Sequence, residues 1–339
     1  MGLIIPLFIP HRGCPHQCLF CNQESITGEK ENQIDYAQTA RATIDEWLAR
    51  ESGHKDSREV EVAFYGGSFT CLNLDVQEEL LSLVQPYIRD GKVDGIRLST
   101  RPDCVTPETG PFLRKFGVKK VEIGVQSMDD SVLMASKRGH SAEESLLAVQ
   151  LLQKGGLEVG MQVMVGLPLE TRKSFLRGLE KIVEASPHFV RLYPVLVVRC
   201  SELEERFLAG KYQPLSLAEA IVLSEKFQAR MDRAHIPVIR IGLQASVDLD
   251  KVYVAGPFHP SFGELVQSRK WFVNLRQSLA NLNVGEILEL TISHRDLSVV
   301  QGIKKYNIKR LEHLGLRDRL RIVVENTRER GDALFKICS

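Results

Sequence analysis

Three cysteines near the start of the chain are the residues best suited to chemistry. Cys14, Cys18 and Cys21 are separated by three and by two residues in the segment GCPHQCLFCN. Thiolates are good ligands for zinc and for iron–sulfur clusters. A loop this tight can offer three sulfurs to one cubane cluster and leave its fourth iron without a protein ligand. Such an open iron is a place where a substrate or cofactor can bind.

Two alternatives explain the same cysteines without a reaction. A structural zinc ion would need a fourth ligand to complete a tetrahedron, and His11 or His16 is available for it. The three cysteines can also be unrelated and simply buried, as free cysteines often are. The cluster is favoured because other motifs, described below, indicate a cofactor site.

The other four cysteines have no cluster-forming spacing. Seven cysteines are an odd number and follow no secretory signal, which argues against a disulfide framework. We therefore expect these four to be reduced, and we expect three of them to be small buried side chains. Three of them follow predicted strand ends, so a radical quencher or a ligand at a second site is the alternative for them. The three are Cys71, Cys104 and Cys200, and the fourth is Cys338.

Composition and charge describe an ordinary globular protein. Hydrophobic residues make up 43% and charged residues 26% of the 339 residues, which disfavours disorder, collagen and coiled coil. The formal net charge of +1 gives no reason to expect nucleic-acid binding from charge alone. The apolar stretch at residues 3–10 is far shorter than a membrane span, and no basic segment precedes it. We expect a cytoplasmic protein with no membrane partner.

Apolar, β-branched runs alternate with segments of helical period, which predicts an α/β fold. Strands that are apolar throughout are typical of a parallel sheet covered by helices, and right-handed crossovers wind such a sheet into a closed or partly open barrel. The carboxyl ends of its strands carry the chemistry. The predicted strands cover residues 3–9, 60–65, 95–100, 118–125, 159–165, 189–196 and 236–241, and the predicted helices cover residues 36–50, 76–88, 107–115, 142–154, 171–184 and 217–234.

The pattern changes after Leu243. Residues 255–262 are rich in Pro and Gly and are predicted to form a connection. A small α+β appendix follows, with helices predicted over residues 263–281 and 299–314 and strands over 287–292 and 320–324. The predicted domains are therefore a core of residues 1–245 and a C-terminal α+β domain of residues 246–339.

With Phe20 directly before the third cysteine, the cysteine spacing resembles the signature of the radical S-adenosylmethionine (radical SAM) superfamily. The resemblance implies a partial (β/α)6 TIM-like barrel in which Cys14, Cys18 and Cys21 hold one 4Fe-4S cluster. It also implies that S-adenosylmethionine chelates the fourth iron through its methionyl group. One electron then cleaves the sulfonium bond, and the resulting 5′-deoxyadenosyl radical abstracts hydrogen from a substrate, which is chemistry of the cofactor in a site that the protein shapes.

A Gly pair at the end of the second predicted strand supports the resemblance. The run YGGSFT is similar to the family's GGE motif, in which backbone atoms of the Gly pair contact the methionyl amine. Only residues without a Cβ allow that approach. The resemblance thus assigns Gly66, Gly67 and Ser68 to the cofactor, with Ser68 in place of the usual Glu. A plain turn is the alternative.

A second match lies at the end of the fourth predicted strand. In coproporphyrinogen III oxidase-like relatives, a Gln contacts the nucleoside ribose and an Arg twelve residues later pairs with the methionyl carboxylate. Gln126 and Arg138 have this separation. A guanidinium suits a carboxylate, and a carboxamide can donate to and accept from ribose hydroxyls. For Arg138 the alternative is a solvated cation at a helix end.

A third match, MQVMVGLP, ends the fifth predicted strand and resembles the family's glycine-containing motif beside the adenine. The resemblance places Gly166 there and aligns Gln162 with a ribose-binding Asp of relatives, a departure that leaves the role of Gln162 open. Backbone atoms near the next strand end, at Leu192 and Tyr193, would hold the adenine. Both residues can equally be core residues.

Several longer runs resemble the radical SAM domain of the Elongator catalytic subunit over residues 1–245. That subunit continues into an acetyltransferase domain for wobble-uridine modification of tRNA, and no domain of that size is expected here. In the STRPD run, Arg101 and Asp103 either orient a substrate or form a buried ion pair that holds the loop. The shared runs are GGSF, STRPD, EIGVQS, RGH, GLP and RLYPVLVVRCSEL.

The C-terminal residues 291–339 are basic, with 11 Lys and Arg against six Asp and Glu. Lys304, Lys305, Lys309 and Arg310 can grip RNA phosphates or can form the solvated face of a helix. Three functions follow: a radical enzyme acting on RNA such as tRNA, a radical enzyme acting on a small molecule or protein, and a non-catalytic haem- or cluster-handling protein. The first two require an electron donor such as flavodoxin or ferredoxin.

Overall fold

A computed structural model describes residues 2–9, 14–22, 36–51, 59–243 and 247–338. The chain divides into two compact units. Unit 1 comprises Met1–Ser216 with Arg230–Phe258, and unit 2 comprises Leu217–Ala229 with His259–Ser339. Among the described helices, none has both the length and the apolar character needed to cross a membrane.

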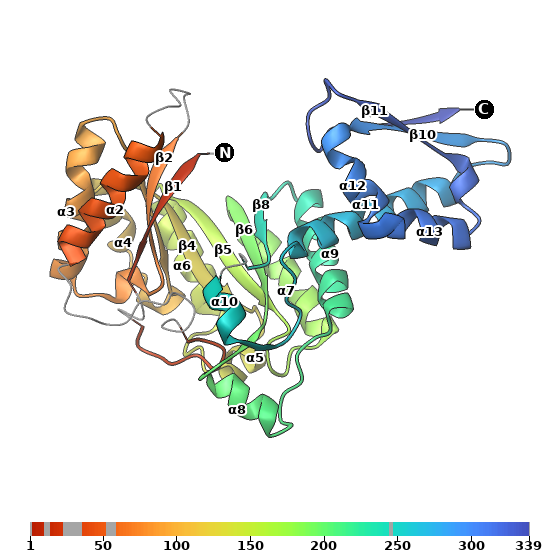
Figure 1. The fold of residues 1–339 in the computed structure, drawn as a ribbon. Coiled ribbons are helices and arrows are strands. Elements are labelled where there is room, and N and C mark those ends of the chain that lie inside the picture. The colour runs from red at the N-terminus through yellow and green to blue at the C-terminus, as the bar shows by residue number, and fades with distance from the viewer. Residues whose placement is uncertain (1, 10–13, 23–35, 52–58, 244–246, 339) are drawn as a thin grey trace. The chain divides into compact units, whose positions relative to one another are not determined.

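Unit 1 is built on a curled sheet of seven parallel strands in the order β1-β2-β3-β4-β5-β6-β8 (Figure 1). This confirms the predicted α/β partial barrel. Each strand pairs in parallel with its neighbour, so all carboxyl ends lie at one edge. The strands are β1 Leu3–Phe8, β2 Val60–Tyr65, β3 Gly95–Thr100, β4 Val118–Gln126, β5 Glu158–Val165, β6 Phe189–Pro194 and β8 Val238–Ile241.

Helices connect successive strands, and local signals fix where several of them begin. Ser141 and Glu144 form a capping box at the start of α6, and Thr171 with Ser174 does the same for α7. Such caps satisfy backbone N–H groups that the first helical turn leaves open. The helices of unit 1 are α2 Tyr36–Glu51, α3 Leu74–Arg89, α4 Thr109–Lys115, α5 Asp130–Ala135, α6 Ala142–Lys154, α7 Arg172–Ala185, α8 Glu202–Leu208 and α10 Val247–Val252.

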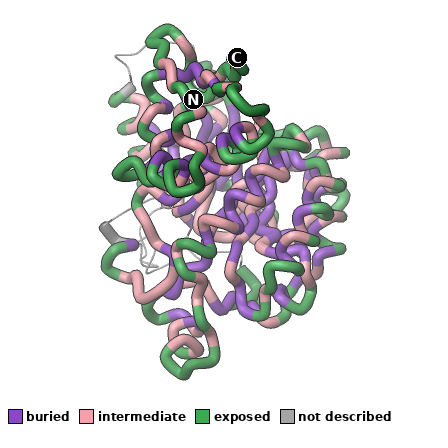
Figure 2. Tube along the Cα trace, turned by 90° about the vertical axis from the view of Figure 1, so that its right-hand side faces the viewer, coloured by how far each residue is buried: buried purple, intermediate pink, exposed green. Residues whose placement is uncertain are grey.

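The two faces of the sheet differ in chemistry. Every second residue of the central strands is apolar and buried, as at Leu98, Ile123 and Val163. The alternate positions carry polar side chains, including Glu122 and Arg191. These strands are therefore apolar on one face only, and not throughout as expected from the sequence. In Figure 2 the buried positions concentrate on the inner segments of the trace, and the exposed positions lie on peripheral helices and loops.

A disulfide joins two strand ends, and the expectation that Cys71 and Cys104 are reduced is wrong in this structure. Cys71 ends the short helix η1 (Phe69–Cys71) after β2, and Cys104 ends η2 (Pro102–Cys104) after β3. Because β2 and β3 are adjacent and parallel, the residues that follow them meet at the same edge. Sequence separation of the two cysteines concealed this proximity.

Unit 2 packs helices on a three-stranded sheet in the order β11-β10-β12. Leu275, Leu290, Val300 and Leu311 are among its fully buried core residues. The elements are α9 Leu217–Arg233, which begins in this unit, α11 Phe262–Ala280, β10 Ile287–Ser293, η3 His294–Asp296, α12 Leu297–Gln301, η4 Ile303–Lys305, α13 Tyr306–His313, η5 Arg317–Arg319, β11 Leu320–Glu325 and β12 Ala333–Cys338; β7 Val197–Val198 and β9 Tyr253–Ala255 form a separate pair in unit 1.

The single helix predicted over residues 299–314 is wrong. The chain breaks at Gly302, which has φ 75°, and continues through Lys304 and Lys305, both at positive φ. The helix then restarts as α13. Strand β12 was not predicted from the sequence.

Candidate functional site

The cysteine loop after β1 lies at the carboxyl edge of the sheet. Cys14 is exposed, Cys18 is buried and Cys21 is half-buried. Two backbone hydrogen bonds fix the loop, because Leu19 N–H donates to Ser136 O at 3.2 Å and Cys21 N–H donates to Cys18 O at 3.0 Å. Within the described residues, no three His, Cys, Asp or Glu side chains are close enough together to hold one metal ion. The loop thus carries the predicted ligands without gathering all three.

Two buried guanidinium groups converge on the Cys18 thiol. Arg138 Nη1 donates to Cys18 Sγ at 3.1 Å, and Arg101 Nη1 lies 3.9 Å from the same sulfur. The side chains of Arg101 and Arg138 are almost fully buried. Two guanidinium donors thus face the sulfur of one predicted ligand. The surface-cation alternative for Arg138 is therefore wrong.

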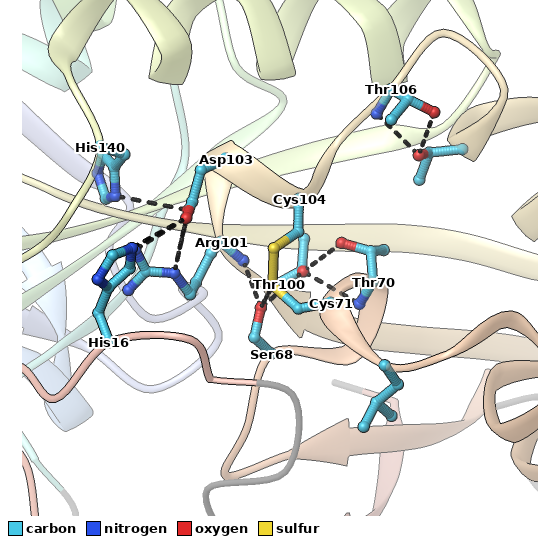
Figure 3. Close-up of a disulfide and its surroundings, with 12 residues drawn as sticks. His16, Ser68, Thr70, Cys71, Thr100, Arg101, Asp103, Cys104, Thr106 and His140 are labelled. Carbon is cyan, nitrogen blue, oxygen red and sulfur yellow. Dashed lines mark hydrogen bonds and ion pairs between the residues drawn. A yellow bond between two sulfur atoms is a disulfide. The ribbon is translucent and has the colours of Figure 1, made fainter.

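Asp103 links three segments of this site (Figure 3). It accepts three hydrogen bonds from Arg101: Nε to Oδ1 at 3.0 Å, Nε to Oδ2 at 3.3 Å and Nη2 to Oδ2 at 3.1 Å. Its carboxylate also lies 3.9 Å from ring nitrogens of His16 and His140. Arg101 Nη2 donates to the Arg138 carbonyl as well. Arg101 and Asp103 of the STRPD run therefore form an ion pair that holds the loop, which is one of their two expected roles.

Glycine allows the cysteine loop to approach the RGH segment. A Cβ on Gly139 would lie 2.4 Å from the His16 ring, and Gly139 has φ 72°. A side chain there would displace the ring. The adjacent His140 is buried, its Nε2 lies 3.3 Å from Val125 O, and burial together with Arg138 lowers its pKa to about 4.

The Gly66–Ser68 turn contacts the cysteine loop directly. The backbone of Ser68 lies beside the Cys14 thiol. Desolvation raises the pKa of the Cys14 thiol although the residue as a whole is exposed, and the neighbouring Cys18 raises it further. Ser68 itself is buried, and its Oγ accepts from Arg101 N–H at 3.1 Å. Ser68, which follows the Gly pair, is thus brought close to one predicted ligand.

Gln126 and Arg138 meet around Gly124. A Cβ at Gly124 would lie 2.9 Å from Gln126 Nε2 and 3.3 Å from Arg138 Nη2. Arg138 Nη2 donates to the Gly124 carbonyl at 2.6 Å. Gln126 adopts the left-handed φ of 65° at the end of β4, which turns the strand end. The twelve-residue separation therefore brings these two side chains to one place.

Gly166 is held by its neighbours at the end of β5. Its N–H donates to Glu170 Oε2 at 2.7 Å, and its carbonyl accepts from Tyr212 Oη at 2.6 Å. Burial raises the pKa of Glu170 to about 8. The other residues assigned near the adenine differ among themselves: Leu192 is a fully buried core residue, whereas Tyr193 is half-buried.

The sequence analysis did not predict a polar network that lies on the face of the sheet opposite its apolar face. Glu122, which is fully buried, lies 2.9 Å from Arg191 Nη2 and accepts from Gln162 Nε2 at 2.8 Å. Tyr65 Oη donates to the same carboxylate at 3.2 Å, and Arg97 Nη1 lies 3.7 Å from it. Gln162 is thus engaged with Glu122. The signal in the sequence is a charged residue at alternate positions of otherwise apolar strands.

The basic residues of unit 2 differ in their surroundings. Arg310 stacks on the Phe272 ring at 3.7 Å, so it contributes to packing. Lys304, Lys305 and Lys309 are exposed. Several other arginines pair with carboxylates or carbonyls of the same unit: Arg317, Arg319, Arg321, Arg328 and Arg330.

Sequence comparison finds two family matches. A sequence model described as the radical SAM superfamily matches residues 8–182, and one described as the Radical_SAM C-terminal domain matches residues 187–271.

Relatives with similar sequence are also found. The chain is 29% identical over 248 residues to a tRNA uridine(34) acetyltransferase of Methanocaldococcus infernus, which covers 61% of this chain and 46% of that protein. It is 28% identical over 206 residues to protein YhcC of Escherichia coli, covering 60% of this chain and 63% of that one. The chain spans about half the length of the acetyltransferases it matches.

Solved structures with a similar fold are also found. The archaeal Methanocaldococcus infernus Elp3 with an N-terminal deletion superposes with a TM-score of 0.62 at 22% identity, over 82% of this chain and 63% of that one. A match at this identity shows a common fold.

Proposed function

The chain belongs to the radical SAM superfamily, and on that premise we propose that it cleaves S-adenosylmethionine reductively at a 4Fe-4S cluster held by Cys14, Cys18 and Cys21. When bound, this pair of cofactors supplies a 5′-deoxyadenosyl radical that abstracts hydrogen from a substrate. Membership and fold make the chain an enzyme of this superfamily. The residues of this chain bind, orient and shield the cofactors.

One observation carries the proposal: three separate motifs contact one another at the carboxyl edge of the sheet. The Ser68 backbone lies beside Cys14, and Arg138 Nη1 donates to Cys18 Sγ at 3.1 Å. These residues come from β1, β2 and the segment after β4. A set of unrelated turns and buried cysteines would not be expected to converge in this way.

The donor types at the site fit a thiolate-bound cluster. Cys14 and Cys18 carry free thiols, the ligand type that binds iron–sulfur clusters, and the Cys18 sulfur faces two guanidinium groups. The buried Nε of Arg138 has no hydrogen-bond partner in the described structure. Buried N–H groups are normally paired, so this donor is available to a carboxylate. It supports the assignment of Arg138 to the methionyl carboxylate.

The remaining cofactor contacts follow from position. The Gly66–Gly67 backbone would contact the methionyl amine, with Ser68 holding the turn. Gln126 lies beside Arg138 and would contact the ribose. Gln162, Gly166, Leu192 and Tyr193 complete the proposed nucleoside side of the site. Because Leu192 is a core residue, only its backbone can take part.

RNA is the substrate class that we propose, with reducing electrons from a donor such as flavodoxin or ferredoxin. Relatives named as tRNA uridine(34) acetyltransferases support RNA. The exposed segment of residues 303–306, with Lys304, Lys305 and Tyr306, offers charge and an aromatic ring.

Anaerobic cluster reconstitution tests the cluster assignment. The wild type should bind about four irons per chain, and single Ala variants of Cys14, Cys18 and Cys21 should each abolish this. Cys200→Ala and Cys338→Ala are matched controls that should retain full iron content. Zinc in place of iron, or full iron content in Cys18→Ala, would refute the assignment.

A further inference from the structure

The disulfide between Cys71 and Cys104 lies at the strand ends that form the candidate site (Figure 3). The two residues are 33 positions apart in sequence, and their Cα atoms are 5.1 Å apart. No second disulfide accompanies it in the part of the chain that the structure describes. Free thiols are found at Cys14, Cys18, Cys200 and Cys338.

The disulfide packs directly on the Gly66–Ser68 turn. Ser68 Oγ lies 2.8 Å from Cys71 Sγ and donates to it, because a disulfide sulfur carries no hydrogen. The same hydroxyl lies 3.2 Å from Thr100 Oγ1 and accepts from Arg101 N–H. The bond thus closes a compact group of contacts between the ends of β2 and β3.

Both segments tied by the disulfide contact the cysteine loop. From the β2 side, the Ser68 backbone lies beside Cys14. From the β3 side, Arg101 points to Cys18. A cross-link between two segments restricts how far they can separate, and its removal returns that freedom. Opening the disulfide therefore gives more freedom of movement to Ser68 and Arg101, which lie against the predicted cluster ligands.

The pair is accessible to small reagents, because Cys71 and Cys104 are only half-buried. A low-molecular-weight disulfide can oxidise the pair by exchange: one thiolate attacks it and releases a thiol, and the second cysteine displaces the other thiol. Two protein thiols become one disulfide, and one reagent disulfide becomes two thiols.

We propose that Cys71 and Cys104 form a reversible thiol–disulfide site that clamps the Gly66–Ser68 turn and Arg101 against the cysteine loop. Oxidation closes the clamp and protects Cys18, and reduction opens it. The consequence for S-adenosylmethionine rests on the proposed function, whereas the clamp itself rests on the contacts above. The redox state of this pair thus regulates how well the site is organised.

The first measurement asks whether the pair is reversible. Cluster-free, full-length protein is equilibrated without oxygen in mixtures of reduced and oxidised glutathione, quenched with acid, alkylated and analysed by mass spectrometry. Cys71 and Cys104 should become protected together in one two-electron transition, and Cys200 should not follow it. Protection of neither cysteine at any glutathione ratio would overturn the proposal.

The second measurement asks whether the clamp reaches the cysteine loop. Pulsed alkylation should modify Cys18 about fivefold faster or more in a Cys71→Ser/Cys104→Ser variant than in the oxidised wild type, because local opening exposes the thiol. Reduced wild type should react like the variant, which covers the case of a variant that folds poorly. Cys200 should react at one rate throughout. Equal Cys18 rates in both redox states would refute the clamp, and because neither cluster nor S-adenosylmethionine is present, failure of the proposed function leaves this result unaffected.

Discussion

Arg138 combines two tasks at the level of single residues. Its Nη1 and Nη2 donate to Cys18 Sγ and Gly124 O. A guanidinium has five N–H donors, so donors remain for a ligand. Removing the side chain is therefore expected to affect both the orientation of the sulfur and the binding of the cofactor.

Arg138→Ala should weaken S-adenosylmethionine binding by about 1.5–3 kcal/mol, the range for a charge-assisted hydrogen bond. Anaerobic calorimetry on protein of measured iron content separates this loss from loss of cluster. Arg177→Ala is the matched control, because the Arg177 side chain is 68% exposed. A dissociation constant equal to that of the wild type would remove Arg138 from the cofactor site.

His140 makes the stability of the protein depend on pH. Burial and Arg138 lower its pKa from 6.5 to about 4, so the unfolded chain binds a proton at a higher pH than the folded chain does. Stability contributed by neutral His140 is fully present above pH 6.5 and is lost as the pH falls toward 4. Between pH 7 and pH 5 the loss is about 2 kcal/mol.

Denaturant unfolding at the two pH values measures this effect. His140→Gln should be less stable at neutral pH but should lose less stability on acidification than the wild type. His294→Gln serves as control, because His294 is exposed. If His140→Gln and wild type lose equal stability between pH 7 and pH 5, the lowered pKa is wrong.

Sequence reasoning found residues with a local spacing and missed those that depend on register. The cysteine motif and the pair Gln126 and Arg138 are local signals. Glu122 and Arg191 meet only because β4, β5 and β6 are adjacent, which no short window contains. The Cys71–Cys104 disulfide was missed for the same reason.

Among the elements, strands β2 and β3 and helix α6 have the bounds predicted from the sequence, because apolar runs and a capping box mark them. The helix predicted over residues 299–314 failed at Gly302. Its side-chain pattern continues across the break, so periodicity did not reveal it. The positive φ of Lys304 and Lys305 has no signal in the sequence.

The break in the predicted helix leaves Lys304 and Lys305 in an exposed segment. The test for RNA binding can therefore be directed at these residues. Replacing Lys304, Lys305 and Lys309 with Gln should flatten the slope of log affinity against log salt by about 2, at roughly 0.7 per lost phosphate contact with single-stranded RNA. Arg310 is left in place because it packs on Phe272. Filter binding of tRNA over a range of salt concentrations gives the slopes.

The control for this test changes an exposed lysine elsewhere in the chain. Lys173→Gln alters an exposed Lys of α7 and should leave the slope unchanged. If the triple variant and the wild type bind tRNA with the same slope, the loop is a solvated surface. A small-molecule or protein substrate then becomes the preferred alternative.

At the scale of the whole molecule, the sequence predicted the barrel and an α+β C-terminal unit. The barrel fold by itself does not identify the substrate. The same fold supports many reactions, because function resides in the site. The chain also spans about half the length of the acetyltransferases it matches. The activity of those whole proteins is therefore not transferred to this chain.

Formation of 5′-deoxyadenosine tests the central claim most directly. Cluster-loaded protein is incubated without oxygen with S-adenosylmethionine and a one-electron reductant, and the products are separated by chromatography. Wild type and Cys200→Ala should both release 5′-deoxyadenosine and methionine, whereas Cys18→Ala should release neither. Cluster-loaded wild type that binds S-adenosylmethionine and leaves it intact under reduction would contradict the account.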